Sequence, residues 1–118
     1  MPVSILNHKG KEIIYVDHKG LQGEGMINCF KEASKEILLR KNTALSLADF
    51  TGVDISKEFI EYLKSEEVKP ITQCVKKEAI IGVSGIKKMV LNIYSALTGS
   101  GAKVFNTQEE AMDFLVAD

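Results

Sequence analysis

Two carboxylates and a hydroxyl lie close together in the segment from Asp49 to Asp54, where Thr51 and Gly52 form a turn between the two aspartates. Paired carboxylates can exchange protons in acid–base catalysis or hold a hard metal ion. More often, an aspartate at the end of a strand accepts hydrogen bonds from the backbone amides of the loop that follows it. We therefore expect Asp49 and Asp54 to organise this loop and, with Thr51 and Gly52, to form part of a binding site.

A second candidate is Ser84, which directly follows the apolar run from Ala79 to Val83. Hydrolases with a Gly-x-Ser-x-Gly pattern place a nucleophilic serine between a strand and a helix, but Ile86 stands where the second glycine is needed. Serine is also a preferred N-cap, because its hydroxyl accepts a hydrogen bond from a free amide of the first helical turn. We expect Ser84 to cap a helix and, with Gly85, to border a binding site.

Two cations follow Ser84 within the first turn of that expected helix, at Lys87 and Lys88. A positive charge at this end opposes the helix dipole and costs about 0.3–1 kcal/mol per residue. An anionic ligand or an acidic partner surface would reverse the sign of that cost. Two alternatives stay open, one in which the lysines bind an anion and one in which both side chains point into water.

The histidines and cysteines do not form a recognisable metal or catalytic motif. His8 lies in the turn between the first two expected strands and His18 follows the second, so the two could face each other across the hairpin. They lack a third metal ligand, and we expect both to be solvated turn residues. Cys29 and Cys74 are far apart in apolar surroundings, which favours reduced, buried thiols. We expect no catalytic residue, no metal and no cofactor, and therefore a protein that is not an enzyme.

Size and composition restrict the class of protein further. The chain has 118 residues, 45% hydrophobic and 26% charged residues, and a net charge of −1, which fits one globular domain over residues 1–118. No basic excess is present to bind a nucleic-acid backbone, and no apolar run approaches the roughly 20 residues of a membrane span. The N-terminus lacks the pattern of a signal peptide, so we expect a cytoplasmic location.

Hydrophobic periodicity and turn residues divide the chain into alternating strands and helices. In order, we expect a hairpin of strands near 3–6 and 12–17, a helix at 24–40, a strand at 43–49, a helix at 57–68, a connection at 71–77, a strand at 79–83, a helix at 84–97, a strand at 103–106 and a last helix from the capping box at 107–110. The order β-β-α-β-α-β-α-β-α predicts an α/β fold with a mainly parallel sheet of four or five strands, an N-terminal β-hairpin and about four helices.

Parallel strands bring the candidate residues to one edge of the sheet. In open α/β sheets, ligands bind beyond the carboxyl ends of the strands. The loops after the strands at 43–49, 79–83 and 103–106 end at that edge. The candidate residues of the first two loops are thus expected to lie near one another.

Three segments with consistent order and spacing resemble the SpoIIAA-like, STAS-domain family: Leu47–Gly52, Ile80–Asn92 and Phe105–Leu115. The resemblance covers nearly the whole chain and implies the same α/β fold. Members of this family include anti-sigma factor antagonists, which bind a partner kinase and are switched by phosphorylation of a serine in an Asp-Ser-Ser-Gly loop. The corresponding residues here are Asp49-Phe50-Thr51-Gly52, with Phe50 at the phosphorylated position, so Thr51 is the candidate phosphorylation site implied by the resemblance.

Together, the residues and the resemblance predict a non-enzymatic regulatory or binding domain. It would dock a protein partner or a small anion at the loops after the third and fourth strands, through Asp49, Thr51, Gly52, Asp54, Ser84, Gly85, Lys87 and Lys88. One alternative is a carrier of an apolar or lipid-like ligand held between helix and sheet, and a remote one is a small hydrolase. An exposed edge strand of the hairpin would also allow a homodimer.

Overall fold

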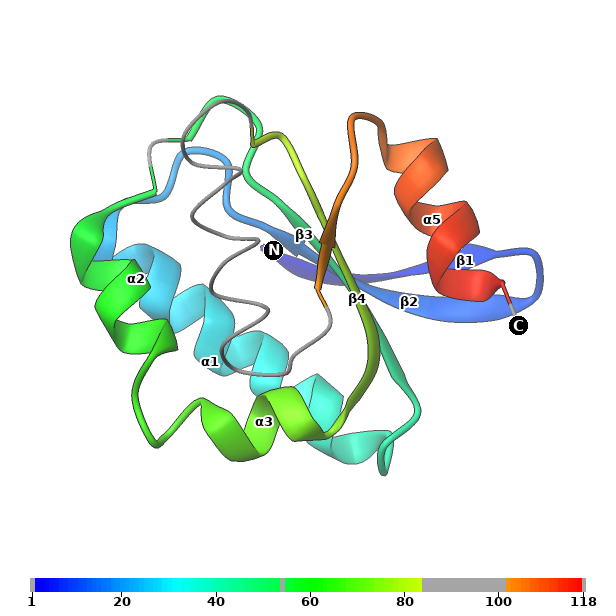
Figure 1. Cartoon of the computed structure of the whole chain (residues 1–118), viewed down its shortest axis with the longest axis horizontal. Helices are drawn as coiled ribbons and strands as arrows, with labels where there is room; N and C mark the ends of the chain where they lie inside the picture. Colours follow the sequence, from blue (N-terminus) through cyan, green and yellow to red (C-terminus); the bar gives the residue numbers. More distant parts are fainter. Residues whose placement is uncertain (1, 54, 84–101, 118) are drawn as a thin grey trace.

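A computed structural model describes residues 2–53, 55–83 and 102–117 and shows one five-stranded sheet with helices on both faces (Figure 1). The strands, in sheet order and in chain order, are β1 (Val3–His8), β2 (Lys11–Asp17), β3 (Ala44–Asp49), β4 (Val75–Ile81) and β5 (Lys103–Val104). β1 and β2 form an antiparallel hairpin, and the other neighbouring pairs are parallel. The predicted α/β fold with a mainly parallel sheet and an N-terminal hairpin is confirmed.

The two faces of the sheet carry different helices. On one face lie α1 (Gly23–Leu39), α2 (Lys57–Leu63) and α3 (Lys69–Gln73), and on the other lies α5 (Gln108–Val116) (Figure 1). Alternation along β3 explains the division: Ala44 packs with residues of α1, whereas Leu45 and Leu47 pack with residues of α5. The small side chains of β3, Ala44 and Ala48, thus face the side of the sheet that α1 covers.

Local sequence signals set several helix ends. Ser56 caps α2 by accepting a hydrogen bond from the amide of Phe59, and Thr107 caps α5 in the same way from the amide of Glu110. Lys41 and Asn42, which follow α1, both have positive φ, as expected for a turn that ends a helix. The predicted starts of α2 and α5 and the predicted end of α1 are therefore confirmed.

The segment between α2 and β4 differs from the sequence expectation. α2 ends at Leu63, whereas we expected a helix to about Val68, and a separate short helix, α3, follows with Pro70 in its first turn. Proline is tolerated in a first turn because the amide it lacks has no partner there. β4 begins at Val75, before the expected start at Ala79, because its early residues pair with β3 from Ala44 onward.

Several expectations fall on residues outside the described ranges, among them the helix at 84–97 and Asp54.

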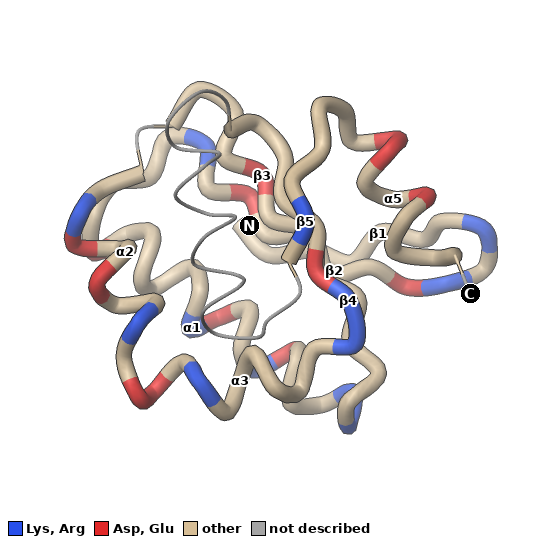
Figure 2. Tube along the Cα trace, viewed as in Figure 1, with Lys and Arg blue, Asp and Glu red and all other residues tan. Residues whose placement is uncertain are grey.

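Acidic and basic residues are interspersed along the described chain without a long run of one sign (Figure 2). In the described ranges, no helix is both long and apolar enough to cross a bilayer.

Candidate functional site

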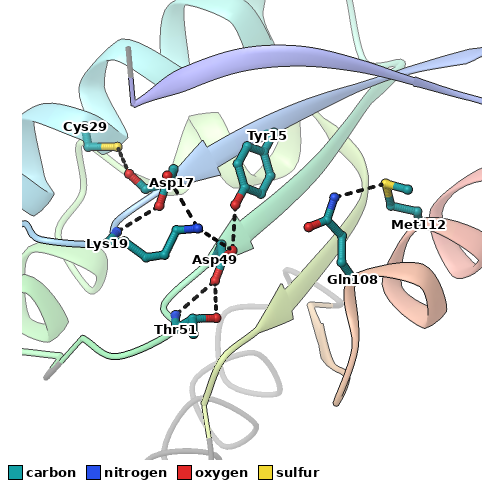
Figure 3. A network of polar contacts seen from close by, with 8 residues as sticks. All are labelled: Tyr15, Asp17, Lys19, Cys29, Asp49, Thr51, Gln108 and Met112. Carbon is teal, nitrogen blue, oxygen red and sulfur yellow. Dashed lines mark hydrogen bonds and ion pairs between the residues drawn. The ribbon is translucent and has the colours of Figure 1, made fainter.

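The carboxylate of Asp49, the last residue of β3, is buried, with 4% of the residue exposed. Its Oδ1 accepts hydrogen bonds from the backbone amide of Thr51 at 2.9 Å and from the Thr51 hydroxyl at 2.6 Å. Its Oδ2 accepts a hydrogen bond from the Tyr15 hydroxyl at 2.6 Å (Figure 3). Asp49 thus ties the first residues of the following loop to the sheet, as expected for an aspartate at a strand end.

Strand register brings these groups together. In the parallel pair of β2 and β3, Asp17 lies opposite Asp49 and Tyr15 lies opposite Leu47, so all four residues point to the same face. Lys19, just after β2, places its Nζ 3.9 Å from Asp17 and 3.8 Å from Asp49 (Figure 3). Two carboxylates therefore share one half-exposed ammonium, and this cluster has a net negative charge.

Burial and hydrogen bonding act in opposite directions on Asp49. Burial would raise the pKa of its carboxyl, but the hydrogen bonds from Thr51 and Tyr15, with the nearby Lys19 ammonium, lower that pKa below its ordinary value. The pKa of Tyr15 is raised, first by burial and then by the hydrogen bond to Asp49. Near neutral pH, Asp49 is an ionised acceptor and Tyr15 a neutral donor.

The loop after β3 also rests on the end of β4. Gly82 has a φ of +82°, and a Cβ built on it would lie 2.2 Å from the backbone nitrogen of Thr51. The amide of Phe50 donates to the carbonyl of Ile81 at 2.9 Å. Two neighbouring strands thus hold one loop, whose tip residues Thr51 and Gly52 are exposed.

Phe50 is buried in the core, with 3% of the residue exposed. It occupies the position that is phosphorylated in the anti-sigma factor antagonists that the sequence resembles. Its ring stacks on the imidazole of His18 at 4.4 Å between centroids, with 3° between the planes. Of the two residues after Asp49, only Thr51 therefore presents a hydroxyl near solvent. That hydroxyl donates to Asp49.

The described part of the chain brings together three predicted site residues: Asp49, Thr51 and Gly52. The other five lie outside the described residues, namely Asp54, Ser84, Gly85, Lys87 and Lys88. The expected meeting of the two loops therefore stays a prediction for those five residues.

An open cleft of about 650 Å³ adjoins the tip of this loop. It lies between residues 20–24, where α1 begins, and the segment that contains Gly52, Val53 and Ser56. Glu24 is the one charged residue among the described residues that line it. The carboxylate of Glu58 also reaches Gly23, 3.3 Å from where a Cβ would stand. The described walls of this cleft thus favour a cationic group over an anion.

The expectation that His18 is solvated is wrong. Its side chain is buried, with 1% of the residue exposed, and its Nδ1 has no hydrogen-bond partner. Burial lowers the pKa of His18 to about 4, although Asp17 and Asp49 act to raise it. The sequence did contain a signal for this burial. Ile14, Val16 and His18 follow one another at intervals of two residues, so strand alternation turns all three to the same face of the sheet. His8, by contrast, is only partly buried and pairs with Asp113 at 2.8 Å.

An apolar cavity of about 50 Å³ lies between the sheet and the helices α1, α2 and α3, in the region where the carrier alternative places a ligand, but none of its described lining residues is among the predicted site residues. Besides His18, its polar wall residues include Ser46 of β3 and Glu78 of β4, which lie opposite each other in register. Burial raises the pKa of Glu78 to about 7. Glu78 and Ile80 are two residues apart, so in one strand their side chains point to the same face. The sequence did not indicate that β4 starts before Ala79, and the direction of Glu78 was therefore not predicted.

Within the described ranges, no group of three or more histidine, cysteine, aspartate or glutamate side chains could hold a metal ion. Cys29 and Cys74 are free thiols; Cys29 is buried as expected, and Cys74 is only partly buried. Burial raises the pKa of the Cys29 thiol to about 12, so it is neutral and unreactive near pH 7.

By sequence, the chain matches no protein-family model and no curated protein. By structure, it is similar to an uncharacterised protein of the DUF3478 family from Shewanella loihica PV-4, whose crystal structure has a SpoIIAA-like fold. The TM-score is 0.62 at 18% sequence identity, and the match covers 96% of this chain and 91% of the other. The chain therefore has a SpoIIAA-like fold, as the sequence resemblance predicts.

Proposed function

We propose that this protein is a non-enzymatic regulatory or binding domain that docks a protein partner through the loop tip at residues 51–53, where Thr51 and Gly52 are exposed. The observation that carries the proposal is the buried Asp49 carboxylate, which binds both the amide and the hydroxyl of Thr51. A loop fixed in this way keeps its exposed residues in one arrangement, which lowers the entropy lost when a partner binds. The SpoIIAA-like fold supports a regulatory or binding role.

The charge around the loop defines the kind of partner. Asp17 and Asp49 share the single Lys19 ammonium, and Glu24 lines the cleft beside Gly52. A partner surface with lysine or arginine side chains would complement this charge and be steered towards it. The small anion of the sequence hypothesis would depend on Lys87 and Lys88. Binding of inorganic phosphate that is unchanged by Lys87→Glu with Lys88→Glu would remove that idea.

Phosphorylation of Thr51 is the regulatory step that fits this geometry. A phosphate on the hydroxyl would remove its donation to Asp49 and place two further negative charges beside a buried carboxylate. The loop would then leave its position on β3, and docking would weaken. Intact mass measurement of protein from its native cells, followed by peptide mapping, tests for one phosphate at Thr51.

The docking proposal is tested by site-specific crosslinking. A photo-reactive amino acid replaces the exposed Gln22, which lines the cleft beside Gly52, in one protein and the exposed Lys35 of α1 in a control, and crosslinked partners are identified by mass spectrometry. A partner captured from position 22 alone is then purified, and its affinity for substituted proteins is measured by calorimetry.

Thr51→Arg should weaken that affinity at least about tenfold, because it adds bulk and positive charge at the centre of the contact. Thr43→Arg is the matched control, since Thr43 is also an exposed threonine whose hydroxyl makes one local hydrogen bond. Equal affinities for the two variants would refute docking at this loop.

The second candidate function, a carrier of an apolar ligand, is favoured by the cavity between helices and sheet. The described cavity walls contain no lysine or arginine to hold a carboxylate or phosphate head group. Lipids with anionic heads therefore fit these walls poorly. Mass spectra of organic extracts that contain no ligand would count against this function.

We also propose a cytoplasmic location. The free thiols of Cys29 and Cys74 support it, because disulfides are rare in reducing compartments. Fractionation of cells, with the protein detected by antibody, would contradict this location if the protein were found with secreted or membrane fractions.

A further inference from the structure

Aromatic rings and a few polar side chains line the apolar cavity. Three phenylalanines line it, Phe30 from α1, Phe50 after β3 and Phe59 from α2, together with the imidazole of His18. Ser46 and Glu78 contribute polar groups from the central strands. A cavity of about 50 Å³ has room for about three to five waters, and therefore for a ligand of about as many non-hydrogen atoms.

Glu78 is the one anionic residue among the described residues of the cavity wall. The helices that face it contribute apolar or neutral side chains: Phe30, Ala33 and Ile37 from α1, Phe59 and Leu63 from α2, and Ile71 and Thr72 from α3. His18, the other titratable residue of this wall, is neutral near pH 7 because burial lowers its pKa to about 4.

The lysines next to Glu78 in sequence do not neutralise it. Lys77 points to the opposite face, where its Nζ donates to the carbonyls of Phe114 and Ala117. Lys76 lines a different hollow, together with Arg40 and Leu115. No hydrogen bond or ion pair joins the carboxylate of Glu78 to the side chain of any described residue, and burial is the cause of its raised pKa.

A partly buried carboxylate without a cation is unfavourable in its ionised form. A positive group bound beside it would remove that penalty. Aromatic faces add to the attraction, because their quadrupole favours cations and the apolar part of a ligand packs on them. A second polar point is available at His18, whose Nδ1 is buried and unpartnered.

We propose that this cavity binds a small organic cation, of the primary alkylamine class, with its ammonium between Glu78 and Ser46 and its alkyl chain against the phenylalanines. This site is on the sheet face opposite the Asp49 carboxylate and is independent of docking at the loop tip. The two proposals can therefore fail separately.

The test compares three probes with the same three-carbon chain, which suits the size of the cavity: n-propylamine, n-propanol and propanoate. Binding is measured by calorimetry at pH 8 and located by shifts of backbone amide signals in NMR spectra. We expect n-propylamine to bind at least about tenfold more tightly than n-propanol, a charge-assisted difference of about 1.4 kcal/mol, and to shift the signals of Ser46, Glu78 and Ile80. Propanoate should not bind.

Two further measurements assign the interaction to Glu78. Glu78→Gln should remove the preference for the amine over the alcohol, whereas Glu66→Gln, at an exposed glutamate, should leave it unchanged. Between pH 6 and pH 8, the affinity for n-propylamine should rise by about tenfold in the unaltered protein, because Glu78 ionises in that range, and should stay constant in Glu78→Gln.

Three results would overturn the proposal: no binding of n-propylamine, equal binding of n-propanol, or an amine preference that persists in Glu78→Gln. Chemical shifts that map to the loop at 51–53 in place of the cavity would also overturn it, and this result does not depend on the folding of any variant.

Discussion

At the scale of the residue, Asp49 shows how one side chain can order a loop. It accepts two hydrogen bonds from Thr51 and one from Tyr15, and it is ionised because these bonds outweigh the effect of burial on its pKa. Its role was predictable from the sequence, since an aspartate at a strand end often binds loop amides. Tyr15 was not predictable as its partner, because the contact depends on the register of β2 against β3.

Thr51→Val tests the hydroxyl of this network while keeping the shape of the side chain. Its loss removes a donor to an ionised acceptor, so the free energy of unfolding should fall by about 1–2 kcal/mol at pH 7. Asp49 has a lowered pKa in the folded state, so its stabilising effect is present above its unfolded pKa and is lost as the pH falls. The penalty of Thr51→Val should therefore shrink towards pH 3, as measured by urea denaturation.

Thr43→Val is the control, because the Thr43 hydroxyl donates to a neutral backbone carbonyl. Its effect should be about 0.5–1 kcal/mol and the same at both pH values. If Thr51→Val and Thr43→Val lost equal stability at every pH, the hydroxyl of Thr51 would not act through an ionised Asp49.

At the scale of the element, local signals and long-range pairing contributed differently. The caps at Ser56 and Thr107 and the end of α1 follow from residues within a few positions, so the sequence located them well. The start of β4 at Val75 depends on pairing with Ala44 of β3, and such distant pairing is not visible in a local pattern. Because that start was missed, the inward direction of Glu78, and with it a polar group in the cavity wall, was missed as well.

The contact between the end of β4 and the loop after β3 is tested with a pair of glycines. Gly82 and Gly10 both have a φ of +82°, but a Cβ on Gly10 would meet no atom within 4 Å, whereas one on Gly82 would lie 2.2 Å from the Thr51 nitrogen. Gly10→Ala should cost about 1–2 kcal/mol, the penalty of the left-handed conformation alone. Gly82→Ala should cost at least about 3 kcal/mol, because overpacking is added. Thermal unfolding followed by circular dichroism compares them, and equal costs would contradict a close contact between the two elements.

At the scale of the whole molecule, two titratable groups on the same sheet face, the buried His18 and the partly buried Glu78, give opposite pH dependences. The folded pKa of His18, about 4, lies below its ordinary 6.5, so the unfolded state binds more protons between these values and stability falls as the pH falls from 6.5 to 4. The folded pKa of Glu78, about 7, lies above its ordinary 4.5, so the folded state holds the proton and stability falls as the pH rises from 4.5 to 7. The two effects oppose each other between pH 4.5 and 6.5.

Glu78→Gln should separate these effects. The variant keeps the shape of the side chain and removes its charge, so it should match the unaltered protein near pH 4.5 and exceed its free energy of unfolding by about 1–3 kcal/mol at pH 8. Its stability should also rise from pH 4.5 to 6.5, because the effect of His18 is then unopposed. Urea denaturation at pH 4.5, 6.5 and 8 measures this, with Glu66→Gln as the control. A loss of stability in Glu78→Gln at pH 8 would mean that the ionised carboxylate already has a favourable partner in the folded protein, and an added cation would then gain little from binding beside it.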